Sequence, residues 1–241
     1  MADARRSGLD RIQRRRLGPA AALIAIAVLV LVGAAAHDSP GAATLTEDGA
    51  AYAASVDRGT LTVQNRRSGS NQREIHWAVS QPDVTDSTAC TTWRSGVGLS
   101  QNGLAFRIAR HRGSYRAVVL ERNVYGDRFT AFKLIYFSDR RFDVDPAVVD
   151  LSPYLVTADR TAVYPLRVCA QLRGSRLAFT VARDGDVMPP FGTAGRGGTF
   201  EVHRPPSRGA TGIYVAHVPR GTSAVIDAMT LDGNTAPPPG V

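Results

Sequence analysis

Cysteine is scarce in this sequence: the 241 residues contain only Cys90 and Cys169. Two thiols exclude a disulfide-dense scaffold and a four-cysteine zinc or iron–sulfur site. They form no C-x-x-C motif, which argues against thiol redox chemistry. The histidines stand singly, with no H-x-x-x-H or H-x-H pair, so the sequence predicts no metal site.

Lysine is almost absent as well, because Lys133 is the only one among 29 basic residues. The formal net charge is +8. Residues 1–37 hold six arginines and two aspartates, a surplus of +4, which leaves +4 for the other 204 residues. That surplus is small for a domain of this size, and no nucleic-acid-binding motif accompanies it. We therefore expect no nucleic-acid partner.

Long apolar runs are limited to one, the uncharged 20-residue stretch 17–36. A helix of this length is about 30 Å long, enough to cross the hydrocarbon core of a bilayer. Six arginines precede it, so the positive-inside rule places the basic segment 1–16 in the cytoplasm and residues 38–241 outside. The sequence therefore predicts a single-pass signal anchor over 17–36 and a location in the cell membrane.

Cleavage of this segment is the alternative to an anchor. Ala34, Ala35 and Ala36 offer a small-x-small site, and cleavage after Ala36 would make the protein secreted. Beyond it, residues 37–51 are rich in Ala, Gly, Asp and Ser and are predicted to be an extracytoplasmic tether. Residues 234–241 are predicted to be a Pro-rich tail.

The chain between residues 52 and 233 mostly alternates apolar and polar residues with a period of two, which is typical of strands. Turn residues such as Gly174 separate the runs. About ten to twelve short strands predict one all-β domain, an antiparallel jelly-roll sandwich that follows one N-terminal transmembrane helix. We expect the acidic run 142–145 to lie in a polar turn and residues 145–151 to form at most one helical turn.

Several strand patterns in this domain resemble a known group. The run YPLRVCAQLRGSRLAFTVARDGD (164–186) pairs an L-R-V strand with a strand that ends in Asp-Gly. The run ATGIYVAHVPRGTSAVIDAMTLDG (210–233) follows, and GLAFRI (103–108) precedes them. Together they resemble concanavalin A-like lectin/glucanase sandwiches of the laminin-G type. The resemblance covers about half of the chain and implies a fold rather than an activity.

The glucanases of that group carry their carboxylates as E-x-D-x-x-E on one strand, and this sequence lacks the motif. Retaining hydrolysis needs two carboxyl groups about 5–5.5 Å apart, so a non-catalytic role is favoured and no catalytic residue is predicted. We expect no cofactor. Calcium at Asp227, with Glu47 and Asp48, is an alternative without a complete ligand set.

The predicted export favours a disulfide between Cys90 and Cys169, with two unbridged buried thiols as the alternative. Candidate ligand-binding residues lie at positions that alternate with the core: Arg107, Lys133, Arg167 and Gln171, with Trp93 as a stacking platform. If their strands are neighbours, these side chains form a cationic groove. Otherwise the face is an ordinary polar surface and the tryptophans belong to the core.

The sequence thus predicts a membrane-anchored, extracytoplasmic binding protein of the cell envelope. Its predicted partners are the membrane, through residues 17–36, and an envelope glycan or an envelope protein. Two alternatives stay open. One is an enzyme that processes envelope saccharides through a site the sequence does not reveal, and the other is an accessory subunit of a membrane protein complex.

Overall fold

The computed structural model describes residues 40–46, 50–67, 69, 71–95, 101–125, 129–159, 161–227, 229–231 and 234–235. The predicted anchor over 17–36 lies outside these residues. Within the described ranges, no helix has the length and hydropathy that crossing a membrane requires.

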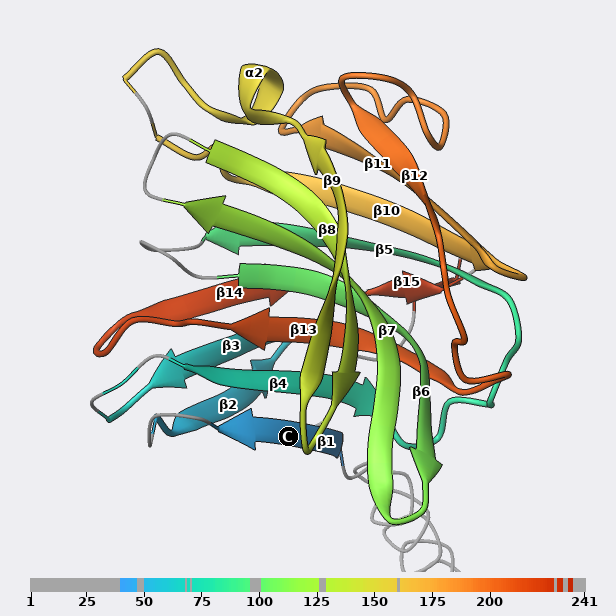
Figure 1. The fold of residues 1–241 in the computed structure, drawn as a ribbon. Coiled ribbons are helices and arrows are strands. Elements are labelled where there is room, and N and C mark those ends of the chain that lie inside the picture. Colours follow the sequence, from blue (N-terminus) through green and yellow to red (C-terminus); the bar gives the residue numbers. More distant parts are fainter. Residues whose placement is uncertain are drawn as a thin grey trace, which may run out of the picture. The chain divides into compact units, whose positions relative to one another are not determined.

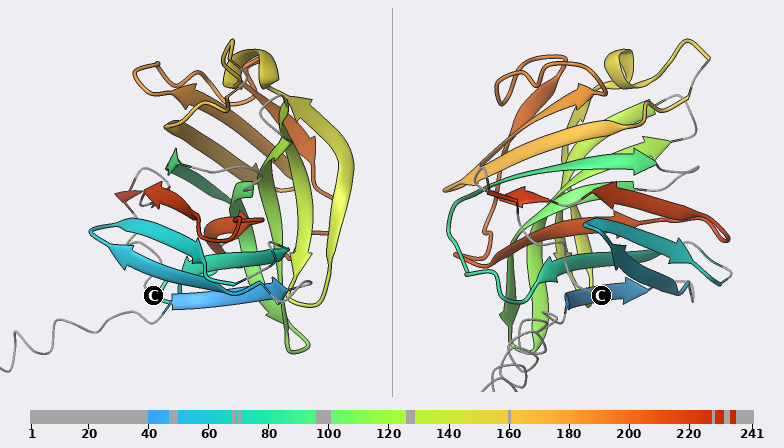
Figure 2. Two further views of the ribbon diagram at one scale, coloured as in Figure 1. Left: turned by 90° about the vertical axis from the view of Figure 1, so that its left-hand side faces the viewer. Right: turned by 180° about the vertical axis from the view of Figure 1, so that it is seen from behind.

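Two antiparallel sheets stack face to face, as Figures 1 and 2 show. Sheet A has the order β1 (Pro40–Thr46), β4 (Gln72–Ala78), β13 (Ala210–Ala216), β6 (Gln101–His111), β7 (Ser114–Tyr125), β8 (Phe129–Ser138) and β9 (Phe142–Asp150). Sheet B has the order β12 (Gly197–Glu201), β11 (Arg176–Arg183), β10 (Leu166–Arg173), β5 (Ser87–Ser95), β14 (Ser223–Asp227), β3 (Thr60–Asn65) and β2 (Tyr52–Asp57).

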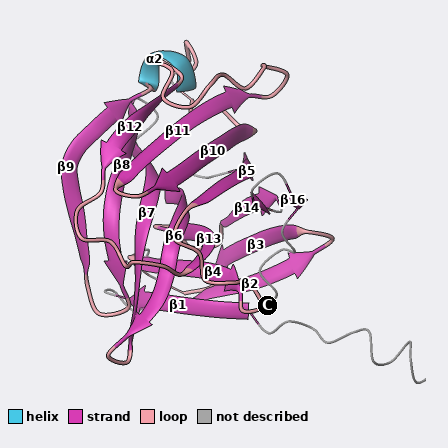
Figure 3. Cartoon of the chain, turned by 90° about the vertical axis from the view of Figure 1, so that its right-hand side faces the viewer, coloured by secondary structure: helices cyan, strands magenta, loops and turns pink. Residues whose placement is uncertain are grey.

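Two very short strands complete sheet B: β15 (Thr230–Leu231) pairs with β5, and β16 (Asn234–Thr235) pairs with β15. The helix α2 (Ser152–Leu155) is a single turn beside the sandwich (Figure 3). The predicted all-β antiparallel sandwich is confirmed, with more strands than the ten to twelve expected.

The predicted tether over 37–51 needs revision, because β1 lies inside it and pairs with β4 along its whole length. The residues of β1 do alternate with a period of two, and Ala43 and Leu45 face an apolar cluster. Because most of them are small, the alternation is hard to recognise in the sequence. Strand β9 likewise replaces the turn expected at 142–145, and the helical turn begins only at Ser152. Since β9 is an edge strand, it tolerates Pro146, which has no N–H, and the neighbouring aspartates.

The main core lies between the sheets and follows the predicted alternation. Leu166, Val168 and Ala170 of β10 are fully buried there. Phe132 of β8 stacks between Trp93 of β5 and Phe179 of β11, with ring centroids 6.2 and 4.7 Å apart. Aromatic rings from both sheets therefore interlock across the middle of the sandwich.

The predicted disulfide between Cys90 and Cys169 is confirmed. The two residues are direct partners on the adjacent strands β5 and β10. A link across 79 residues restricts the unfolded chain, and in the chain-entropy view this stabilises the fold by about 4 kcal/mol.

Candidate ligand-binding face

The outer face of sheet A, which points away from sheet B, is strongly concave. Five strand spacings separate β4 from β9, which is about 24 Å in a flat sheet. Nevertheless the guanidinium carbon of Arg73 on β4 lies 3.7 Å from the ring centre of Phe142 on β9. Trp77 of β4 also reaches Tyr115 of β7, with ring centroids 5.0 Å apart and an interplanar angle of 61°. The sheet therefore curls until side chains from its distant strands meet.

Apolar side chains fill most of this concavity and form a second, smaller core. Its buried members are Ala43, Ile75, Trp77, Ala105, Ile108, Ala117, Val119, Ile135, Phe137, Ala210, Tyr214 and Ala216. The concave face is consequently closed along much of its length.

A buried polar cluster lies within this second core. Glu121 of β7 is completely buried, and its Oε2 lies 3.3 Å from the Nζ of Lys133 on β8. Burial raises the pKa of Glu121 to about 7, although Lys133 and the charge of Arg73 act to lower it. Burial also raises the pKa of Tyr214 well above its usual value. The carboxyl group of Glu121 is fully buried, so a ligand on this face cannot contact it.

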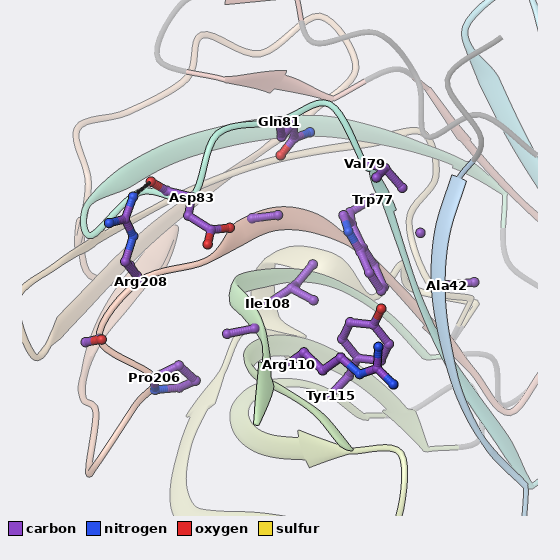
Figure 4. A pocket seen from close by; sticks show the side chains of 14 residues that line it. Ala42, Trp77, Val79, Gln81, Asp83, Ile108, Arg110, Tyr115, Pro206 and Arg208 are labelled. Carbon is purple, nitrogen blue, oxygen red and sulfur yellow. Dashed lines mark hydrogen bonds between the residues drawn. The ribbon is translucent and has the colours of Figure 1, made fainter. Parts of the chain in front are cut away.

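A pocket of about 720 Å³ remains open at the end of the sheet where β4 and β6 end and β7 begins. We call it the aromatic pocket, because Trp77 and Tyr115 form part of its wall (Figure 4). Figure 4 shows Asp83 and Arg208 on the opposite side. A pocket of this size is large enough for a small ligand.

Backbone contacts hold the loops of the aromatic pocket together. Val84 and Gly209 exchange two hydrogen bonds of 3.0 and 3.1 Å between their backbone N–H and C=O groups. Arg208 Nη2 donates to the backbone oxygen of Asp83 at 2.9 Å. Trp77 itself packs directly over Gly41 of β1, where an added Cβ would come within 2.1 Å of the indole ring. These contacts therefore fix the position of the aromatic wall.

Gln81 supplies an unused polar group in this wall. Its Oε1 accepts the backbone N–H of Thr211 at 3.1 Å. Its Nε2 is buried and has no hydrogen-bond partner among the described residues. Such a donor costs free energy unless another group satisfies it.

A second pocket of about 580 Å³ adjoins the first, and Pro206 lines both. It lies between the β6–β7 hairpin, the β8–β9 turn and the segment 203–206. We call it the arginine pocket after five lining residues: Arg112, Arg116, Arg140, Arg141 and Arg204.

The five residues that the sequence suggested as ligand contacts are spread over separate layers. Trp93 lies in the core between the sheets with no exposed surface, which leaves no ring face for stacking. Lys133 belongs to the buried polar cluster on the concave face. Arg167 and Gln171 alternate with the buried residues of β10 and lie on the outside of sheet B. The structure therefore does not bring these four side chains together.

Arg107 connects the two sheets instead of lining a groove. It is 4% exposed, and it donates to the backbone oxygens of Thr85, Pro206 and Gly174 at 2.7, 3.3 and 2.6 Å. The β6–β7 register shifts between Phe106 and Ala109, and Arg107 has a positive φ of 52°. This bulge turns its side chain toward sheet B, which a strict period of two does not predict.

The alternative calcium residues do not form a site in the described chain. Asp227 is engaged by Arg94, with Nε 2.5 Å from Oδ1, and residues 47–49 lie outside the described ranges. No group of three or more metal-ligating side chains occurs among the residues that the structure describes.

Several solved structures align with most of this chain at low sequence identity. A carbohydrate-binding module, CBM66 from Bacillus subtilis, aligns over 79% of this chain and 94% of its own, with 15% identity and a TM-score of 0.45. The exoplasmic/lumenal domain of VIP36 bound to Ca²⁺ and mannose aligns over 80% and 90%, with 11% identity and a TM-score of 0.49. The legume lectin-like domain from Entamoeba histolytica aligns over 79% and 88%, with 9% identity and a TM-score of 0.48. No family profile and no curated protein sequence matches this chain.

Proposed function

We propose that this chain is an extracytoplasmic saccharide-binding protein of the cell envelope, with the aromatic pocket as its binding site. The proposal rests on one combination of residues that line this pocket: the aromatic side chains of Trp77 and Tyr115, and Gln81, whose Nε2 has no partner among the described residues. Sugar rings present C–H faces that pack on aromatic rings, and hydroxyls that accept hydrogen bonds, so both features suit them.

The rest of the pocket also suits binding better than hydrolysis. Asp83 is the only carboxylate among the residues described as lining the aromatic pocket, whereas glycosidases need a pair of carboxyl groups. Glu121 shares the concave face, but its burial and its ion pair with Lys133 keep it from a substrate.

Location outside the cytoplasm is part of the proposal. The disulfide between Cys90 and Cys169 supports it, since such bonds persist in oxidising compartments. Attachment to the membrane through residues 17–36 is inferred from the sequence alone. With the basic segment 1–16 in the cytoplasm, the binding site lies on the outer side of the membrane.

The test uses the full-length chain in mild detergent. Screening against an array of envelope saccharides should reveal saturable binding, and calorimetry on the best ligand then compares Gln81→Ala and Tyr115→Ala with the wild type. Gln64→Ala is the matched control, because Gln64 is exposed on β3 away from the pocket.

Both pocket variants should weaken binding by about tenfold, a loss expected for one hydrogen bond or one stacked ring, while the control keeps full affinity. The proposal would be refuted if the folded protein binds no saccharide on the array. It would also be refuted if both pocket variants bind the ligand with the affinity of the wild type.

A further inference from the structure

The arginine pocket holds an unusual concentration of one charge. Five arginines and two histidines, His111 and His203, line it together with a single acidic residue, Asp143. With neutral histidines the lining carries a surplus of +4, as much as residues 38–241 carry altogether. Like charges that line one pocket repel each other, so the pocket favours occupation by an anion.

The protein itself neutralises little of this charge. Arg141 Nη2 lies 3.8 Å from Asp143 Oδ2, but both side chains are mostly exposed, at 76% and 64%, so the pair is weak. The remaining four, Arg112, Arg116, Arg140 and Arg204, make no ion pair with any described residue.

A nearby carboxylate is used for another purpose. Asp139 accepts the hydroxyl of Ser114 and, at 3.2 Å, the backbone N–H of Tyr115. These bonds join the β8–β9 turn to the β6–β7 hairpin. Asp139 therefore shapes the wall of the arginine pocket instead of pairing with its guanidinium groups.

The other walls are also fixed by hydrogen bonds. Ser138 donates its backbone N–H to the oxygen of Arg141 at 2.7 Å and accepts the N–H of Arg140 and of Arg141 on its hydroxyl. The backbone N–H of His203 donates to Tyr136 Oη at 2.9 Å. The backbones that carry the charges are thus held together before any ligand arrives, which reduces the entropy lost on binding.

We propose that the arginine pocket binds the acidic groups, carboxylate or phosphate, of the same saccharide whose neutral part occupies the aromatic pocket. Guanidinium groups match both anions with paired hydrogen bonds. The shared residue Pro206 makes the two pockets neighbours, so one extended chain reaches both. This inference rests on the proposed saccharide binding and specifies its ligand class as acidic.

The test compares matched ligands on the full-length chain. The probes are an oligogalacturonate, its uncharged methyl ester, a phosphorylated mannan, unphosphorylated mannan and vesicles of phosphatidylglycerol. Arg140→Ser/Arg141→Ser removes two charges from the pocket. Arg66→Ser/Arg67→Ser removes the same charge from two exposed residues after β3 and serves as the control.

At least one acidic saccharide should bind about tenfold or more tightly than its neutral counterpart, as charge-assisted hydrogen bonds predict. The preference should disappear in Arg140→Ser/Arg141→Ser, remain in the control and shrink at high salt.

Equal binding of acidic and neutral saccharides would overturn this inference and leave the proposed function standing. Binding of no saccharide at all would overturn both. Arginine-dependent binding to the vesicles without binding to either acidic saccharide would assign the pocket to a membrane surface and overturn the saccharide assignment.

Discussion

Arg107 of sheet A donates to the backbone oxygen of Gly174 in the β10–β11 turn of sheet B, with Nη2 2.6 Å from the acceptor. Two further bonds, to Thr85 and Pro206, come from the same side chain. A single guanidinium therefore fastens one end of the sandwich and also holds the segment that lines both pockets.

Replacing Arg107 should destabilise the protein. Arg107→Ala removes a buried guanidinium together with its three charge-assisted hydrogen bonds to backbone oxygens, at a cost of about 3 kcal/mol. Urea unfolding measures the change. Arg167→Ala is the control, since Arg167 is exposed on the outside of sheet B, and it should change stability by less than about 0.5 kcal/mol. Equal midpoints for the two variants would contradict the role given to Arg107.

Glu121 should make stability depend on pH. Its pKa is about 7 in the folded protein against a usual 4.5, so the folded state binds this proton more tightly than the unfolded state. Stability from this group is therefore full below about pH 4.5, falls as the pH rises and levels off above about pH 7. Lys133, Arg73 and Tyr214 are the groups that act on it.

Melting temperatures of the wild type and Glu121→Gln between pH 4.5 and 8 test this. The variant should lose the decline that comes from Glu121, whereas Glu201→Gln, at an exposed position on β12, should retain it. Parallel curves for the wild type and Glu121→Gln would show that the carboxyl group does not titrate in this window.

Removing the disulfide should lower stability markedly. Cys90→Ala/Cys169→Ala frees the unfolded chain, for an expected loss of about 4 kcal/mol. Urea unfolding with and without reductant measures it. Reductant should shift the midpoint of the wild type toward that of the variant and leave the variant unchanged. An unfolding midpoint of the wild type that does not change on complete reduction would refute the stabilising role of the disulfide.

Gly41 should control the aromatic pocket from beneath. In Gly41→Ala the new Cβ would meet the Trp77 ring at 2.1 Å, so the indole must move. Affinity for the ligand identified on the array should drop by about fivefold to tenfold, the value of a stacked ring. Thr44→Ala, at an exposed position of the same strand, should bind normally. Unchanged affinity in Gly41→Ala would remove Trp77 from the site.

The sequence predicted the sandwich well because alternation depends only on neighbouring residues. Leu166, Val168 and Leu177 alternate with polar or small positions, and all three are in the core. The orientation of Arg107 was not predictable in this way, since a bulge after Phe106 interrupts the period. Strands β1 and β9 were hidden by small and acidic residues that an edge strand tolerates.

The candidate site depends on information that a single sequence does not contain. Trp77 is one of only two tryptophans in the sequence, but its contact with Tyr115 spans three strand spacings and requires a curled sheet. The arginine pocket likewise gathers residues from positions 111 to 206. Period-two patterns do not encode strand order or curvature, so these neighbours become visible only in three dimensions.

The two tryptophans of the chain occupy very different places: Trp93 in the core between the sheets and Trp77 in the wall of the aromatic pocket. The protein thus carries two built-in optical reporters. In Trp93→Phe the remaining fluorescence follows ligand entry at Trp77, and in Trp77→Phe it follows the opening of the sandwich at Trp93. Occupancy and unfolding can therefore be recorded separately on the same protein without an attached label.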